Sequence, residues 1–267
     1  MIINSNLQAQ INSDNLATST ARLSKSLARL SSGSKIVDPS DDAAGLAVAA
    51  RLDAEVKRLN AARSNVSNAL SFTQTQDGYL RRISKALDRM SELSLLSQDV
   101  TKTDADRSLY NNEFTQLAGY ITEASSKTFN GVSLFTSTAL DVTTDADGST
   151  FPLTGVNLGG PVYTTALASN VSTNAGASTA LDNVKSAINL LSEDRATIGA
   201  AQARLNYTSE QLTVSRQNVS AASSRIQDAD VAEEATEYAK QNILVQAGTA
   251  MLAQANQVPQ SVLRLLQ

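Results

Sequence analysis

The stretch that decides the fold is VKSAINLLSEDRATIGAAQARLNYTSEQLTVSRQNVSAASSRI, residues 184–226. An apolar side chain recurs at every seventh position without a polar interruption, at Val184, Leu191, Ile198, Leu205, Leu212, Val219 and Ile226. A seven-residue repeat of this length is typical of a helix that supercoils, left-handed, against a partner. The simplest partner is a helix over 41–98, where the step, broken only by Thr73, recurs at Leu52, Leu59, Val66, Leu80 and Leu87.

Both ends of the chain carry the same period. The helix expected over 2–32 has apolar side chains at Ile2, Ala9, Leu16, Leu23 and Leu30. The last segment, 230–267, has two adjacent apolar strings, Leu244, Met251, Val258, Leu265 and Val245, Leu252, widened by Ala255 and Val262. We expect Pro259 to kink this helix or to force a local adjustment there. The layout predicts that the end helices pair antiparallel and that the long helices just inside them pair again.

The middle of the chain differs in character. A third helix is expected over 104–127, and residues 129–177 are rich in Gly, Ser and Thr. Short β-prone runs flank turn signals there, notably Asp147-Gly148, and Gly159-Gly160-Pro161 is interpreted as a turn. The prediction is a small β-hairpin region with a thin core, forming the tip of the molecule. The fold class is therefore mainly α: a long antiparallel coiled-coil or helical-bundle rod with a small β-hairpin region.

Composition narrows the function. The 267 residues include no Cys and no His, which removes thiolate metal sites, disulfides and the commonest general base. The net charge of -4 disfavours a nucleic-acid partner. Three pairs of acidic residues cluster in the sequence: Asp41-Asp42, Asp228-Asp230 and Glu233-Glu234. Helix capping explains the first pair, and a solvated helix start explains the other two. We expect no enzyme, no cofactor and no metal.

The two ends carry almost no charge. No charged residue lies between Lys240 and Arg264, and Asp14 is the only one in residues 1–21. Two alternatives are a solvated low-charge helix and a membrane segment, the second disfavoured by dense amides and by Pro259. We expect instead that both faces become buried, one within the chain and one against further copies of it. Such helices would be poorly ordered in an isolated monomer.

Three stretches resemble one family. Arg29-Leu30-Ser31-Ser32-Gly33-Ser34-Lys35-Ile36 followed by Asp41-Asp42-Ala43-Ala44-Gly45-Leu46-Ala47 resembles the N-terminal signature of bacterial flagellins. Arg225-Ile226-Gln227-Asp228-Ala229-Asp230 and Ala255-Asn256-Gln257-Val258-Pro259-Gln260-Ser261-Val262-Leu263 resemble their C-terminal junction and end, and Phe129-Asn130-Gly131 the motif after their third helix. The matching stretches occur in the same order as in flagellins and cover both ends of the chain.

The resemblance implies a subunit that polymerises into the flagellar filament for swimming motility, in a short form without large outer domains. It implies a terminal coiled-coil domain (1–40 plus 230–267) lining an inner tube and a helical rod (41–229) forming an outer tube. It also implies type III export to the cell exterior, no membrane insertion, and as partners a filament cap protein, hook-associated proteins and a secretion chaperone at the C-terminal helix. A hook–filament junction protein, which shares such helical ends, is the alternative.

One further implication concerns a vertebrate innate immune receptor. Leu87-Asp88-Arg89-Met90-Ser91-Glu92-Leu93 resembles the stretch that this receptor reads in many flagellins. Arg89 and Leu93 match the contact pattern and Glu113 falls at the spacing of a third contact, whereas Asp88 replaces a Gln and Ser91 replaces an Arg. Ordinary solvent-facing helix charges would give the same pattern. The two replacements predict weak recognition.

Overall fold

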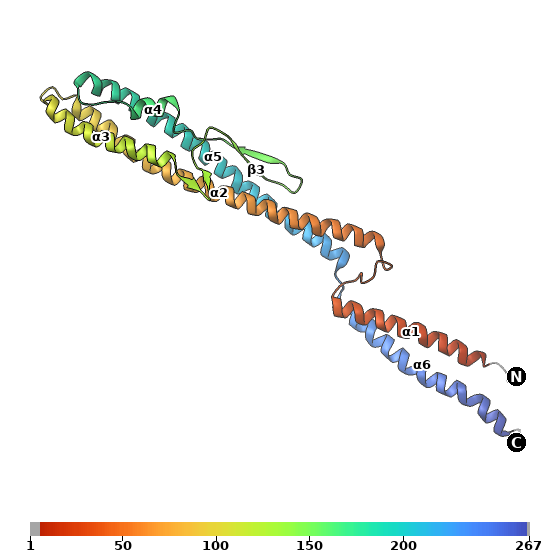
Figure 1. The fold of residues 1–267 in the computed structure, drawn as a ribbon. Coiled ribbons are helices and arrows are strands. Elements are labelled where there is room, and N and C mark those ends of the chain that lie inside the picture. Colours follow the sequence, from red (N-terminus) through yellow and green to blue (C-terminus); the bar gives the residue numbers. More distant parts are fainter. Residues whose placement is uncertain (1–5, 266–267) are drawn as a thin grey trace. The chain divides into compact units, whose positions relative to one another are not determined.

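The computed structural model describes the backbone of residues 6–265 and the side chains of residues 6–257 (Figure 1). The helices of this part are α1 (Leu7–Ser32), α2 (Ala43–Ser97), α3 (Asp104–Ser125), α4 (Pro161–Leu167), α5 (Asn174–Gln227) and α6 (Val231–Leu265). Two antiparallel hairpins accompany them: β1 (Thr128–Phe129) with β2 (Val132–Ser133), and β3 (Leu140–Thr143) with β4 (Thr150–Leu153). The mainly-α prediction is confirmed.

The chain forms two units. The first comprises Met1–Glu55 and Asn218–Gln267, and the second comprises Val56–Gln217. The predicted division at residues 40/41 and 229/230 refers to the inner and outer tubes of a filament, and it stays a prediction.

The first unit holds the helix pair α1 and α6 together with the segments that join them to α2 and α5. Gly33 ends α1 in the left-handed conformation, with φ 68°, which glycine adopts without a steric penalty. Beyond it, Ser34 pairs with Asp228 as an isolated antiparallel bridge, and the backbone N–H of Lys35 donates to the Gln227 carbonyl oxygen at 2.7 Å. This short pairing ties the start of the linker after α1 to the end of α5.

The second unit is built on the predicted pairing of α2 with α5. Asn174 Nδ2 donates to the Gln98 carbonyl oxygen at 2.7 Å, and Arg195 Nε lies 3.0 Å from Asp77 Oδ1. Because higher numbers on α5 meet lower numbers on α2, the two helices run antiparallel. Every member of the heptad string that falls in this unit is buried, namely Val184, Leu191, Ile198, Leu205 and Leu212.

Helix α3 folds back along α2 and completes the core. A capping box starts α3: the Thr103 hydroxyl accepts from the Asp106 backbone N–H, and the Asp106 carboxylate accepts from the Thr103 N–H. Phe114 and Ile121 on α3 are fully buried in the same apolar cluster as α2 and α5. Arg107 closes the α2–α3 connection, because its Nε donates to the Ser97 carbonyl oxygen at 2.8 Å.

The β-hairpin region does not form the tip of the rod, which corrects the sequence prediction. Gln76 Nε2 donates to the Leu134 carbonyl oxygen at 2.7 Å, and Arg58 Nε donates to the Ala146 carbonyl oxygen at 3.1 Å, so the region lies along α2 (Figure 1). The reason is α3, whose return along α2 brings the chain back before the first hairpin begins. The tip of the second unit is formed instead by the α2–α3 connection and the start of α5.

The region also contains a helix that the sequence interpretation missed. Pro161 was expected in a turn but occupies the first turn of α4, where its missing N–H costs no hydrogen bond. Tyr163 and Ala166 on α4 are buried, and the Tyr163 hydroxyl donates to Asp194 Oδ2 at 2.6 Å. These contacts give the region a larger share of the core than the expected thin hairpin would have.

Candidate self-association surface

Helices α1 and α6 pack side by side and run in opposite directions, as predicted (Figure 1). The Asn6 side chain caps α1 by accepting from the Ala9 N–H at 3.1 Å, and its Nδ2 donates to the Ala255 carbonyl oxygen at 2.8 Å. Near the other end of the pair, Arg29 Nη1 lies 3.5 Å from Glu234 Oε2. The N-terminus of α1 therefore lies beside the C-terminal half of α6.

On α1, the seam that faces α6 is only half apolar. The predicted string Ala9, Leu16, Leu23 and Leu30 is half-buried. Between its members, at seam positions that a stable coiled coil fills with apolar residues, stand the polar residues Asn12, Ser19 and Ser26. The area of apolar surface removed from water is correspondingly small, and so is its contribution to stability.

On α6, the seam is equally mixed. Val245 and Leu252 are half-buried and Ala255 is buried. Gln241, at 1 % exposure, is buried among them; its Nε2 donates to Glu237 Oε1 at 2.6 Å, while its Oε1 has no hydrogen-bond partner within the described part of the chain. A buried polar atom without a partner costs free energy.

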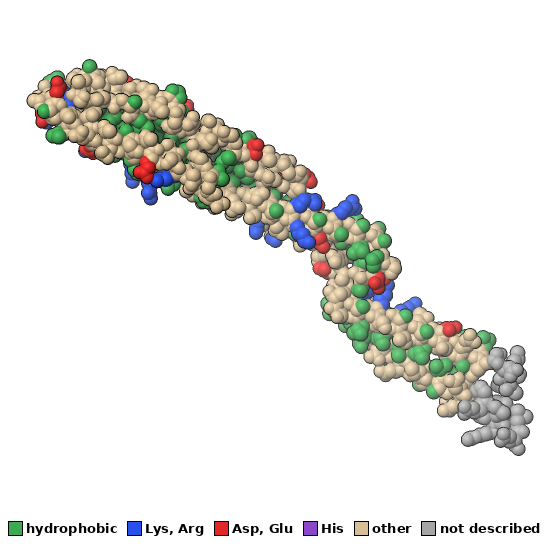
Figure 2. Space-filling view, in the orientation of Figure 1, with side chains coloured by type: hydrophobic (Ala, Val, Ile, Leu, Met, Phe, Trp, Pro, Cys, Tyr) green, Lys and Arg blue, Asp and Glu red, His purple; other side chains and the backbone are tan. Residues whose placement is uncertain are grey.

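Large apolar side chains stand on the outside of the same two helices. Leu244 and Met251, which the sequence assigns to self-association, are exposed, with Met251 at 57 %. Further side chains share this exposure, at up to 70 % for Leu7: Leu7, Ile11, Leu27 and Ile243. Figure 2 shows hydrophobic side chains spread over the visible face of the pair. Ile2 and the side chains of Val258, Val262 and Leu265 lie outside the described residues.

Charged groups of the first unit gather at one end of this pair. Lys25 Nζ lies 2.5 Å from Asp41 Oδ1, and this hydrogen bond holds the pKa of Asp41 below its ordinary value. Glu237 accepts from Gln241 and Lys240, which lowers the pKa of its carboxyl group as well. Toward the chain ends charge is sparse: among the described residues, Asp14 is the only charged side chain in 6–21, and residues 241–257 have none. Of the helices that the structure describes, none has both the length and the hydropathy to cross a membrane.

The residues matched to the receptor pattern lie on the second unit. Arg89 on α2 forms ion pairs with Glu113 on α3, Nε to Oε1 at 2.8 Å, and with Glu92, Nη1 to Oε2 at 2.5 Å. These contacts raise the pKa of Arg89 and lower that of Glu113. Leu93, in contrast, is fully buried in the core. The structure thus places Arg89 and Glu113 together at the surface and Leu93 beneath them.

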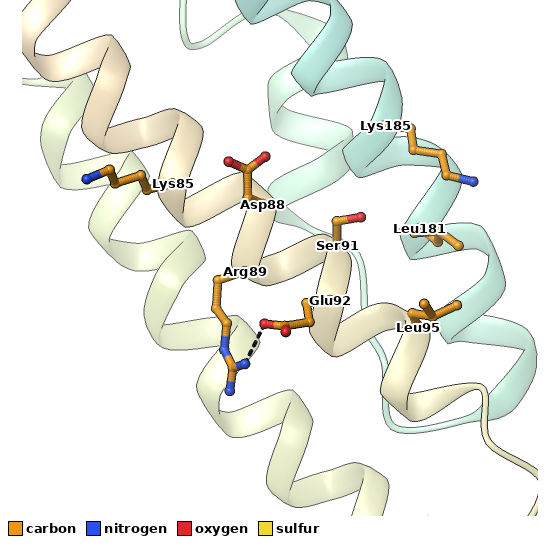
Figure 3. Close-up of a pocket in the computed structure, with 8 residues that line it drawn as sticks. All are labelled: Lys85, Asp88, Arg89, Ser91, Glu92, Leu95, Leu181 and Lys185. Atoms are coloured by element: carbon orange, nitrogen blue, oxygen red, sulfur yellow. Dashed lines mark hydrogen bonds and ion pairs between the residues drawn. The ribbon is translucent and has the colours of Figure 1, made fainter.

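A shallow groove of about 730 Å³ lies beside Arg89, between α2 and α5 (Figure 3). Its lining mixes both signs of charge with apolar side chains: Lys85, Asp88, Arg89, Ser91, Glu92, Leu95, Leu181 and Lys185. No charge sign prevails among these side chains, so the groove has no marked preference for an anion or a cation.

Two of the clustered carboxylates, Asp42 and Asp230, cap helices, whereas Asp41 and Glu234 pair with Lys25 and Arg29. Asp42 Oδ1 accepts from the Gly45 N–H at 2.8 Å near the start of α2, and Asp230 Oδ1 accepts from the Ala232 N–H at 2.9 Å at the start of α6. Asp228 accepts from the Ser224 hydroxyl. Among the described residues, no group of three or more acidic side chains is placed to hold a metal ion.

Two family models cover most of the chain. One, described as the bacterial flagellin N-terminal helical region, matches residues 3–139, and the other, the bacterial flagellin C-terminal helical region, matches residues 181–266. The chain belongs to the bacterial flagellin family. Relatives align over the full length of both chains: the flagellin of Halalkalibacterium halodurans at 36 % identity, the flagellar filament 33 kDa core protein of Treponema phagedenis at 35 % and the flagellin of Bacillus subtilis at 34 %.

Solved structures agree with this assignment. The crystal structure of Bacillus cereus flagellin matches with a TM-score of 0.52 and 27 % identity, covering 60 % of this chain and 94 % of that one. A putative flagellar hook-associated protein from Vibrio parahaemolyticus matches with a TM-score of 0.61 but only 16 % identity, covering 70 % and 100 %. At that identity the likeness shows the fold alone. This flagellin is a structural subunit of the flagellar filament, and the junction-protein alternative is not favoured.

Sequence reasoning missed part of the outer face of this flagellin. A search for strict sevens selects only residues that recur at that step, so Leu7, Ile11 and Ile243 were not singled out. The signal that could have found them is the surplus of large apolar residues beyond the number one seam can bury. The sequence separates two adjacent strings on α6 but does not say which is buried; the structure shows Val245 and Leu252 half-buried and Leu244 and Met251 exposed.

Proposed function

We propose that this flagellin polymerises through the outward faces of α1 and α6. The observation that carries the proposal is the row of exposed apolar side chains on helices that lack charge toward the chain ends. Ile243 at 66 % exposure and Met251 at 57 % are examples. A monomeric protein rarely exposes a patch of this kind, whereas the centre of an interface is depleted in charge and rich in such side chains.

The predicted self-association residues divide by role in this proposal. Leu244 and Met251 contact neighbouring subunits, and Ala9, Leu16, Leu23, Leu30 and Leu252 hold α1 and α6 together so that the outer face is presented. The terminal pair, approximately 1–40 with 230–267, lines the inner tube, and the rod formed by 41–229 surrounds it. Because the apolar seam within the pair is thin, the pair gains much of its order from the assembly.

The remaining partners follow from family membership. We infer type III export to the cell exterior, growth beneath a filament cap protein, contact with hook-associated proteins at the filament base, and a secretion chaperone on the C-terminal helix. We infer also that the chain has no catalytic role, since Asp42 and Asp230 are engaged in capping helices and Asp41 and Glu234 in ion pairs.

Recognition by the vertebrate innate immune receptor is proposed to be weak. Arg89 is engaged by both Glu92 and Glu113, so a receptor group must displace an existing ion pair. Asp88 adds an exposed negative charge beside it. A reporter-cell dose response should show lower potency than that of a strongly stimulating flagellin. Equal potency would refute this part of the proposal.

Truncation tests the proposal on the polymer. Chains lacking residues 1–20 or 248–267 should fail to form filaments in negative-stain electron microscopy, while circular dichroism shows the rod still helical. Full-length protein treated identically is the control and should give long filaments. Normal filaments from both truncated chains would contradict the assignment of the termini to the inner tube.

A further inference from the structure

The pairing of α1 with α6 has a register problem. Apolar residues that recur every seven positions allow a helix to slip by one heptad and meet an equivalent row. The string Ala9, Leu16, Leu23 and Leu30 on α1 has this property, as does Val245 with Leu252 on α6. Because the apolar seam is thin, the difference in free energy between the registers is smaller still. Some feature that does not repeat must therefore distinguish the observed register from its neighbours.

Gly248 is such a feature. A Cβ atom added at Gly248 would lie 3.2 Å from Leu16 Cδ1 and 3.7 Å from Leu16 Cβ, so Leu16 occupies the space that the missing side chain leaves. One heptad away on α6, the equivalent positions are Gln241 and Ala255. Either residue carries a Cβ where Leu16 needs room, so a slip of one heptad in either direction brings Leu16 against a side chain.

Gln241, a polar residue buried in the seam between α1 and α6, favours the same register. It is buried at 1 % exposure, and its Nε2 is held by Glu237 Oε1 at 2.6 Å. Ser26 on α1, another polar seam residue, is buried as well. Buried polar residues at seam positions are known to select one register of a coiled coil at a cost in stability.

We propose that the contact of Leu16 with Gly248 fixes the register of α1 against α6 and thereby aligns their outward apolar side chains for polymerisation. The second half of this inference rests on the proposed function. In a slipped pair, Leu7 and Ile11 on α1 would move by one heptad relative to Met251 on α6, and the shared outer face would no longer match a neighbouring copy. Leu16 and Gly248 are thus positioning residues that need not touch the neighbouring copy.

A cross-link reads the register directly, because the chain contains no cysteine of its own. The parent protein carries Asn6→Cys and Ala255→Cys, at positions that the native register joins by a hydrogen bond of 2.8 Å. A second parent carries Arg22→Cys and Glu234→Cys. Glu234 pairs with Arg29 in the native register, so this second parent reports the slip of one heptad that brings position 248 opposite Ala9. Monomers and filaments are oxidised, intrachain disulfides are separated by non-reducing electrophoresis, and filaments are counted by electron microscopy.

Gly248→Leu is placed in both parents. It should lower the 6–255 disulfide yield several-fold and abolish or shorten filaments. It should raise the 22–234 yield, because that slip places the new side chain opposite the small Ala9. A helix-propensity effect would act in the opposite direction, since Leu favours helix over Gly. Adding Leu16→Ala to Gly248→Leu removes the side chain that the new residue would contact. This double variant should restore the 6–255 disulfide and most filaments. Ala250→Leu, at an exposed position of α6, is the matched control and should leave the 6–255 yield unchanged.

The outcomes separate the two claims. An unchanged 6–255 yield in Gly248→Leu, or no recovery with Leu16→Ala, overturns the register assignment. A shifted disulfide with normal filaments overturns its link to polymerisation. Failure of the unsubstituted full-length chain to form filaments would instead contradict the proposed function, while the disulfide yields would still report the register.

Discussion

The helix pairs of the two units share the same heptad period but bury different amounts of apolar surface. In the second unit, α2 and α5 bury an apolar string against each other and against α3, with Leu205, Leu80 and Ile83 fully removed from water. In the first unit, α1 and α6 meet through a seam that is half polar, while Leu7 and Ile243 face outward. The rod thus contains its own core, and the terminal pair keeps much of its apolar surface for other molecules.

The difference teaches how one chain can be both a stable monomer and a polymer subunit. The free energy of folding resides mainly in the rod, where apolar area is removed from water within the chain. The terminal helices contribute little to that free energy, and in the proposed function they carry the surface that association buries. Substitutions should therefore separate stability from assembly according to the unit in which they lie.

The largest expected effect is that of Leu205→Asp in the rod. It places a carboxylate without a partner in a fully buried position, so the free energy of unfolding should fall by about 4 kcal/mol. Thermal unfolding followed by circular dichroism measures this change. Tyr207→Asp, two residues along and 73 % exposed, is the control and should leave the melting curve nearly unaltered. Equal melting curves for both variants would rule out the α2–α5 core.

The heptad repeat allowed much of the rod to be predicted. It gave the long helices, and their pairing followed from matched length and period. The course of 129–177 was not predictable in this way, because it depends on how far α3 returns along α2 and on side chains such as Gln76, which binds the Leu134 carbonyl oxygen. The outward face of α1 and α6 was found only in part, because periodicity selects strings but does not say which string faces inward.

A paired truncation compares the two seams directly. Leu87→Ala, at a fully buried position of α2, should lower the free energy of unfolding by about 3 kcal/mol, whereas Leu23→Ala, half-buried on α1, should lower it by about 1 kcal/mol or less. Urea unfolding monitored at equal protein concentration measures both. A larger loss from Leu23→Ala than from Leu87→Ala would reverse the account of where stability resides.

On the outer face, Met251→Asp should change unfolding little and assembly greatly. The side chain is 57 % exposed, so the free energy of unfolding of the monomer should stay within about 0.5 kcal/mol of the unsubstituted value. Filament yield by sedimentation and electron microscopy should fall sharply, because the charge would be buried between copies. Met251→Leu is the matched control and should assemble. Normal filaments from Met251→Asp would remove this residue from the interface.

The smallest effects concern the pH dependence of stability, which has opposite signs for two carboxyl groups, Asp194 in the second unit and Glu237 in the first. Burial raises the pKa of Asp194 above its ordinary 3.8, so stability is lost as pH rises through the folded pKa. Asp194→Asn should therefore gain stability relative to the unsubstituted chain as the pH rises above 3.8, and should keep that gain at neutral pH. Hydrogen bonds from Gln241 and Lys240 lower the pKa of Glu237 below 4.5, so its contribution is present at neutral pH and lost on acidification.

Glu237→Gln should accordingly be slightly less stable than the unsubstituted chain at pH 7 and equal to it at low pH. Melting temperatures of both variants across this range measure the two trends. Parallel pH curves for both variants and the unsubstituted chain would show that neither carboxyl group is perturbed by its surroundings.

Hydrogen–deuterium exchange of monomers and filaments tests the central comparison most directly. Backbone amides of α2 and α5 within the second unit should exchange slowly in both forms, because the rod contains its own core. Amides of α1 and α6 should exchange rapidly in monomers and slowly in filaments, because association completes their burial. Slow exchange of α1 and α6 in free monomers, unchanged on polymerisation, would contradict the account.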